Sequence, residues 1–209
     1  MITIHPILQA LIPVNTDAAE RISAPNYDEF QGDLEIWRAI HEAPESVLRV
    51  TMAHCDTDDP SQVIEGDSTQ ALDWARRNME ALRESSLTCE MERLLFVYEI
   101  LDPRRPRTKQ IGLGGMARTE EIQTESSPDG SIIRNEGVRE PKARGRAKLV
   151  EVTRAIVGMV NLAIEDQSGT FAAALSRQVV GISPDYEVTG NGGTTHRIWL
   201  ITEPDAILR

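Results

Sequence analysis

Hydrophobic residues recur at helical spacing in several stretches of the chain. The clearest helix is predicted over residues 67–84, where five apolar side chains would share one face: Ala71, Leu72, Ala75, Met79 and Leu82. A second is predicted over residues 33–43, with Leu34, Trp37 and Ile40 on its apolar face and Pro44 after its end. Further helical segments are predicted over residues 18–22 and 168–179, and residues 203–209 are predicted to begin a short one.

Alternating and β-branched stretches predict strands between these helices. The sequence LLFVYEIL at 94–101 and the returning stretch 109–117 form a predicted hairpin with a long connection. A second hairpin is predicted over residues 186–201, because Asn191-Gly192-Gly193 can supply the positive φ values of a tight turn. Four other short strands are predicted, over residues 2–4, 47–53, 131–133 and 159–164.

The order of these elements predicts the fold class. Because hairpins alternate with helices and helices do not follow every strand, we expect a mixed α+β fold with a mostly antiparallel sheet and flanking helices. The 209 residues, with 40% hydrophobic and 26% charged side chains, are typical of a globular protein. We expect a single α+β domain over residues 1–209.

A basic run occupies residues 131–154 of an otherwise acidic chain. The run holds seven basic and three acidic residues, a net charge of +4, whereas the whole chain carries −11, so the remainder carries −15. Pro141 suits the first turn of a helix that would begin near Lys142. The predicted apolar stripe of this helix contains Leu149, Val152, Ile156 and Val157.

Two interpretations of the basic run stay open. Charges on a helix are most often a solvated face. Alternatively, Arg139, Lys142 and Arg146 share the face at the helix start and, with the backbone N–H groups there, bind a phosphate or carboxylate. In that interpretation Glu136, held among arginines, is a general base or metal ligand.

Charge, apolar runs and cysteine spacing exclude several classes of protein. No apolar run approaches the ~20 residues that span a membrane, and the N-terminus lacks the features of a signal peptide. Cys55 and Cys89 make neither a disulfide framework nor a zinc motif, so a cytoplasmic location is expected. The acidic balance makes nucleic-acid binding an unfavoured third alternative.

Other polar features predict structure rather than chemistry. Asp56, Asp58 and Asp59 lack the spacing of a calcium loop and are expected in an exposed loop, so no metal site is predicted. The glycines of residues 112–115 are not followed by the Lys-Ser/Thr of a phosphate loop. A single histidine in a strand, such as His196, is more often structural than catalytic.

Several stretches resemble, in order, the bacterial and archaeal domain-of-unknown-function family 1015. They are APNYD, ESVLRVT, ALDWARRNMEALRES, the pair LLFVYEI and IGLGGMA, IIRNEGVREPKARGR, and HRIWLITEPDAI. Where members typically carry a His-Glu pair, a Thr and then an Arg, this chain has Asn135-Glu136, Val138 and Arg146. The glutamate and arginine are kept, and the histidine and threonine differ.

The resemblance implies a relation to ParB/sulfiredoxin-like proteins, a group that includes free-serine kinases. It implies a nucleotide- or phosphometabolite-binding part of a kinase-like phosphotransferase, using ATP or ADP with Mg²⁺. Glu136 would be the catalytic base, phosphate would contact Arg134, Arg139, Lys142 and Arg146, and substrate would contact Asn26, Tyr27 and Asn135. Family members normally continue into a further Asp-Gly-His-His-Arg motif, so we expect either the N-terminal part of a longer protein or a naturally short member.

The alternative is a non-catalytic binding or regulatory module that uses the same basic run for an anionic metabolite or an acidic protein face. In both cases the expected ligand is a small anionic metabolite or a nucleotide. A homodimer or a C-terminal partner domain is the expected assembly.

Overall fold

The computed structural model describes residues 2–25, 29–108, 110–134, 137, 139–190 and 192–206. The chain forms two compact units, each built from separate stretches of sequence. The sheet unit contains Met1–Ile12, Glu90–Gly137 and Ala163–Arg209, and the helical unit contains Pro13–Cys89 and Val138–Leu162. The single domain expected from the sequence stays a prediction.

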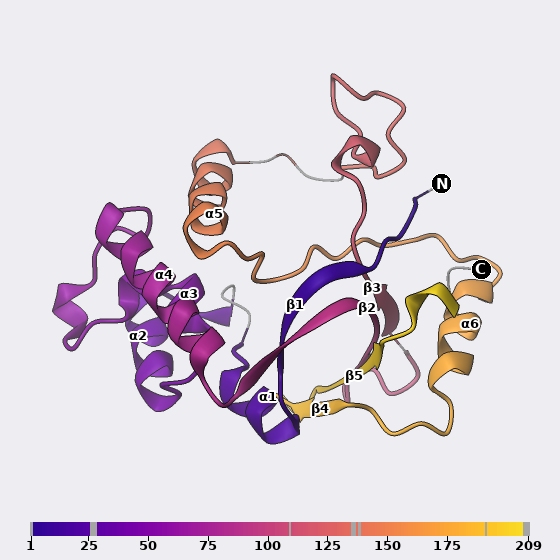
Figure 1. The fold of residues 1–209 in the computed structure, drawn as a ribbon, viewed down its shortest axis with the longest axis horizontal. Coiled ribbons are helices and arrows are strands. Elements are labelled where there is room, and N and C mark those ends of the chain that lie inside the picture. The colour runs from indigo at the N-terminus through magenta and orange to yellow at the C-terminus, as the bar shows by residue number, and fades with distance from the viewer. Residues whose placement is uncertain are drawn as a thin grey trace. The chain divides into compact units, whose positions relative to one another are not determined.

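The sheet unit is built on a five-stranded antiparallel sheet (Figure 1). Its strands follow the order β1-β2-β5-β4, and β3 also pairs with β2. The predicted α+β class is therefore confirmed. The strands are β1 (Ile7–Pro13), β2 (Thr88–Leu101), β3 (Gln110–Gly114), β4 (Tyr186–Thr189) and β5 (Thr195–Ile201).

Both predicted hairpins are present in this sheet. In the first, Phe96 of β2 lies opposite Gly114 of β3, and a Cβ atom at Gly114 would come within 2.0 Å of the Phe96 ring. The absence of a side chain permits this close approach, which explains a glycine at the end of β3. In the second, Gly193 adopts a φ of 74° between β4 and β5.

The core of the sheet unit forms where helix α6 (Thr170–Val179) meets β2 and β5. Leu175 and Val179 of the helix pack with Val97 and Trp199 of the strands. The Trp199 indole N–H donates a 3.0 Å hydrogen bond to the carbonyl of Ile182, so this large side chain is buried without an unsatisfied donor.

A row of charged side chains crosses the same sheet. Arg197 of β5 lies opposite Glu99 of β2 on one side and Glu187 of β4 on the other. Its guanidinium forms ion pairs with both carboxylates. Glu99 is only 5% exposed, so this pairing compensates for the burial of a carboxylate.

The helical unit contains five α-helices among the residues that the structure describes. They are α1 (Thr16–Ile22), α2 (Asp33–Glu42), α3 (Leu48–Thr51), α4 (Thr69–Glu84) and α5 (Glu140–Thr153). Short 3₁₀ helices in the described parts of both units are η2 (Ala53–Cys55), η3 (Pro60–Gln62), η4 (Thr119–Glu121) and η5 (Pro204–Ala206).

Helix α4 forms as the sequence predicts. The Ser68 hydroxyl accepts a hydrogen bond from the Ala71 N–H and caps the start of the helix. Ala71, Ala75 and Met79 are buried along one face, and the alanines allow neighbouring elements to approach closely. A separate cluster joins α2 and α3 to η2 through Ile36, Ile40, Leu48 and Cys55.

The largest disagreement with the sequence prediction concerns residues 47–53. They form helix α3 and part of η2, not a strand. Leu48, Val50 and Ala53 are all buried. A short apolar run that is surrounded on several sides shows no helical periodicity, and the sequence alone cannot distinguish it from a strand.

Three other predicted strands are wrong. The N-terminal strand is β1 at Ile7–Pro13, not residues 2–4, although His5 forms an isolated bridge with Met116. Residues 131–133 contribute only a bridge between Ile132 and Ile122. Residues 159–164 have no regular secondary structure, since β-branched side chains specify a strand only where a neighbouring strand pairs with it.

Some predicted helix faces also need correction. Leu34 is exposed, and the buried face of α2 is formed by Ile36 and Ile40 instead. Helix α5 ends at Thr153, where Arg154 adopts the left-handed conformation, so Ile156 and Val157 lie beyond it. In the described part of the segment predicted over residues 203–209, Pro204–Ala206 form the 3₁₀ turn η5, and residues 207–209 lie outside the described residues.

Candidate functional sites

The basic run that the sequence singles out forms helix α5 of the helical unit. Arg139 is the N-cap residue and Pro141 lies in the first turn, as predicted. Arg139, Lys142 and Arg146 are exposed, and their spacing places them on one face of the helix start. We call these three residues the α5 basic face.

The rest of α5 anchors the helix and leaves this face accessible to solvent. Thr153 is 1% exposed, and the Arg83 guanidinium donates a 2.9 Å hydrogen bond to its carbonyl oxygen. Lys148 forms an ion pair with Asp67 at 3.3 Å. The last turn is therefore fixed to α4, while the first turns present cations and backbone N–H groups outward.

The other predicted site residues lie outside the described residues or in the other unit. Glu136, Asn135, Asn26 and Tyr27 lie outside the described residues. Arg134 is exposed but belongs to the sheet unit. The roles assigned to these five residues stay predictions.

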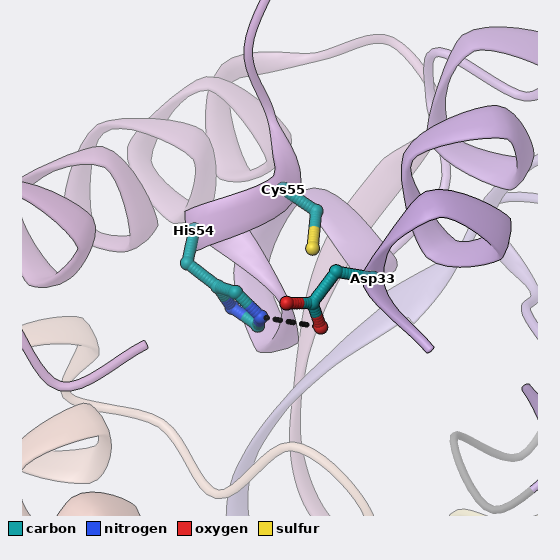
Figure 2. Close-up of side chains that lie close together, drawn as sticks. All are labelled: Asp33, His54 and Cys55. Atoms are coloured by element: carbon teal, nitrogen blue, oxygen red, sulfur yellow. Dashed lines mark ion pairs between the residues drawn. The ribbon is translucent and has the colours of Figure 1, made fainter. Parts of the chain in front are cut away.

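A second constellation, which the sequence analysis did not find, lies elsewhere in the helical unit (Figure 2). It comprises Asp33 from the first turn of α2 with His54 and Cys55 from η2. A carboxylate oxygen, an imidazole nitrogen and the sulfur of these residues all lie within 4.8 Å of one another. We call this the Asp33–His54–Cys55 cluster.

The three side chains differ in their access to solvent. Cys55 is completely buried beside Ile36, Ile40 and Leu48. Burial, together with the negative charge of Asp33, raises the pKa of the Cys55 thiol to about 12. The Asp33 side chain is 58% exposed, and His54 lies between these extremes at 16%. The cluster thus connects the apolar interior to solvent.

The backbone around the cluster holds its residues in place. The Ile64 N–H donates to the His54 carbonyl at 3.4 Å, and the Trp37 indole N–H donates to the Thr57 carbonyl at 2.8 Å. Gly66 lies beside the imidazole, where an added Cβ atom would be 3.4 Å from His54 Nδ1, an ordinary van der Waals contact. The two hydrogen bonds restrict the backbone of η2 and of the residues that follow it.

The acidic loop after η2 has structural roles in the described chain. Asp56 accepts hydrogen bonds from Arg49 and Asn78, and Asp59 caps η3 through the Ser61 N–H. This hydrogen bonding lowers the pKa of Asp59 below its ordinary value. Asp58 and Asp59 are exposed, as the sequence predicts, whereas Asp56 is half-buried.

Two polar side chains of the sheet unit also satisfy each other. The Tyr98 hydroxyl and His196 Nδ1 share a 2.6 Å hydrogen bond between β2 and β5, and burial raises the pKa of Tyr98. This contact fits the structural role expected for His196. A cavity of about 240 Å³ beside Val97, Val179 and Trp199 is smaller than typical ligand pockets.

No helix in the described parts of the chain combines the length and apolar character needed to cross a bilayer.

The chain is thus an α+β protein with an antiparallel sheet unit and a helical unit. The chain belongs to the family described as "Protein of unknown function (DUF1015)", whose model matches residues 4–209. The family resemblance stated from the sequence is therefore confirmed. No curated protein and no solved structure matches the chain, so the wider relation to ParB/sulfiredoxin-like proteins and kinases stays an expectation.

The cluster escaped the sequence analysis for a physical reason. Asp33 begins one helix, whereas His54 and Cys55 lie beyond another, and only tertiary packing brings them together. The adjacent His-Cys pair was the one local signal. It is too common a pairing to indicate a metal site without a third donor.

Proposed function

We propose that this protein binds a phosphorylated or otherwise anionic small molecule through the α5 basic face. The observation that supports the proposal is the grouping of three exposed cations, Arg139, Lys142 and Arg146, at the start of one helix. The whole chain carries a net charge of −11, so this concentration of positive charge is local.

The chemistry of the helix start favours a phosphate group. Guanidinium groups match phosphate oxygens in a bidentate manner, and the helix dipole adds positive potential at the same end. Arg139 provides no side-chain cap of its own, so an anion can accept hydrogen bonds from the N–H groups of the first turn, of which Pro141 supplies none.

Phosphoryl transfer is the finer form of this proposal, and its support is the family resemblance alone. In that reaction the γ-phosphoryl group of ATP passes to a substrate hydroxyl, ADP leaves, and the hydroxyl proton passes to Glu136. The ATP–Mg²⁺ complex would supply the phosphoryl group, and the cations would stabilise its charge. A regulatory module would use the same binding step without the transfer.

Thermal unfolding with ATP, ADP, serine or phosphoserine, each with and without Mg²⁺, tests the binding step. A ligand at a hundredfold excess over its Kd adds about 2.7 kcal/mol of stability. We expect stabilisation by at least one phosphate-containing ligand, and a loss of about tenfold or more in affinity in Arg146→Ala.

Arg144→Ala is the matched control because it removes the same charge from the same helix. Arg144 is exposed but lies roughly 140–160° around the helix from the α5 basic face. Equal losses of affinity in both variants would mean that the ligand responds to the overall positive charge of the helix and not to the α5 basic face. The absence of stabilisation by any of these phosphates would overturn the proposal.

A transfer assay then separates the enzyme from the regulatory module. Conversion of ATP and serine to ADP and phosphoserine, abolished by Glu136→Gln, supports the kinase form. Binding without turnover supports the module.

A further inference from the structure

We propose that the Asp33–His54–Cys55 cluster is a binding site for a divalent transition metal, with Zn²⁺ the best match. The proposal goes beyond the anion site, because it uses different residues and a different chemistry. It rests on the geometry of the three donors, on their chemical identity and on the way the fold holds them.

The separations suit coordination better than hydrogen bonding. His54 Nε2 and Asp33 Oδ1 lie 3.6 Å apart, which exceeds the 2.7–3.2 Å range of N–H···O hydrogen bonds. A nitrogen and an oxygen ligand bound tetrahedrally to zinc at ordinary bond lengths lie about 3.3–3.5 Å from each other, close to this separation. Cys55 Sγ, one imidazole nitrogen of His54 and one carboxylate oxygen of Asp33 all lie within 4.8 Å of one another, so small side-chain rotations would complete the arrangement.

The donor set selects the kind of metal. A thiolate, an imidazole and a carboxylate are the three side-chain ligands of zinc sites, whereas Mg²⁺ and Ca²⁺ prefer oxygen alone. Three protein ligands also leave one tetrahedral position for water or substrate. The exposed Asp33 side chain shows that solvent reaches this side of the cluster.

The fold positions the ligands before any metal binds. Asp33 is fixed by the first turn of α2, and the Cys55 N–H donates to the Met52 carbonyl at 2.9 Å. Gly66 lies beside the His54 imidazole. A site with fixed ligands loses little conformational entropy on binding.

Metal binding changes one protonation state. The Cys55 thiol loses its proton to solvent as the sulfur–metal bond forms, and Asp33 binds as the carboxylate. The metal therefore replaces a proton, and no electron transfer is involved. The positive ion also neutralises the negative charges that meet at the cluster.

Metal titration of the full-length chain tests the proposal. Protein treated with a chelator and then freed of it is titrated with Zn²⁺ by calorimetry and with Co²⁺ by absorption spectroscopy. We expect one ion per chain and a thiolate-to-cobalt charge-transfer band. The band should disappear in Cys55→Ser, and the Zn²⁺ affinity should fall at least tenfold in Asp33→Asn.

The Asp33→Asn variant keeps the test informative if Cys55→Ser folds poorly, because Asp33 is mostly exposed. Two matched controls, Cys89→Ser and Asp58→Asn, alter an exposed cysteine and an exposed aspartate outside the cluster. Failure to bind one equivalent, or an affinity unchanged in Asp33→Asn, would overturn the proposal. An equal loss in either control would do the same.

Discussion

The α5 basic face and the Asp33–His54–Cys55 cluster are opposite kinds of candidate site in the same helical unit. The first is contiguous in sequence, exposed, and built from three cations. The second is assembled from two separate segments and contains a completely buried thiol. The comparison teaches that a run of charged residues in the sequence can indicate a surface site. A set of potential metal ligands from separate segments is recognised only once the folded structure brings them together.

The difference in burial predicts the largest effect, which is on cysteine reactivity. Because the pKa of Cys55 is about 12, its thiolate fraction at neutral pH is on the order of a thousandfold below that of an unshifted thiol. Alkylation of metal-free native protein, followed by mass spectrometry, should modify the exposed Cys89 and leave Cys55 as the thiol. Rapid modification of Cys55 below pH 9 would show that the reagent reaches this thiol, which would contradict its burial.

The second prediction concerns Zn²⁺ and stability. At a hundredfold excess over its Kd, Zn²⁺ should raise the free energy of unfolding of the wild type by about 2.7 kcal/mol. The increase should be much smaller in Asp33→Asn. Urea denaturation with and without Zn²⁺ measures both values, and equal increases would place the metal elsewhere.

The third prediction compares the two cysteines in metal-free protein. Cys55→Ser places a hydroxyl in an apolar core and should lower the free energy of unfolding by about 1–3 kcal/mol. Cys89→Ser should change it by less than about 0.5 kcal/mol, because Cys89 is exposed. Chemical denaturation of the two variants checks the contrast, which would vanish if Cys55 were not part of the core.

The smallest effect is expected at the α5 basic face. Arg146→Ala should alter the free energy of unfolding by no more than about 0.5 kcal/mol, since its side chain is exposed. The same denaturation experiment should give a similar value for Arg144→Ala. A loss several times larger for Arg146→Ala alone would mean that this arginine supports the fold and not a ligand.

The sequence predicted those elements whose pattern is local and long. Helix α4 was predicted because its 16 residues show a clear helical periodicity. The first hairpin was predicted from its two strand-like stretches, and the second from its glycine turn. Helix α3 was missed because four residues enclosed by core give no such pattern. Residues 159–164 show the converse, since their composition favours a strand and the fold supplies no partner strand for them.

The two candidate sites differ in the same way, because a local sequence pattern predicts one and tertiary packing forms the other. The sequence places Arg139, Lys142 and Arg146 on one face because a helix fixes the relation between positions three and four apart. No such rule relates Asp33 to His54, whose proximity depends on how α2 packs against η2. Glu136 and Asn135 lie outside the described residues, so their roles are tested by the transfer assay and not by the structure.

The charged row Glu99–Arg197–Glu187 has a consequence for how the sheet unit reaches its native pairing. In the native register, one guanidinium compensates carboxylates on both neighbouring strands. If β5 shifted by one residue, Arg197 would move to the opposite face of the sheet and Glu99 would be buried without its countercharge. The row therefore disfavours misaligned hairpins during folding, and it links the alignment of three strands to a single side chain.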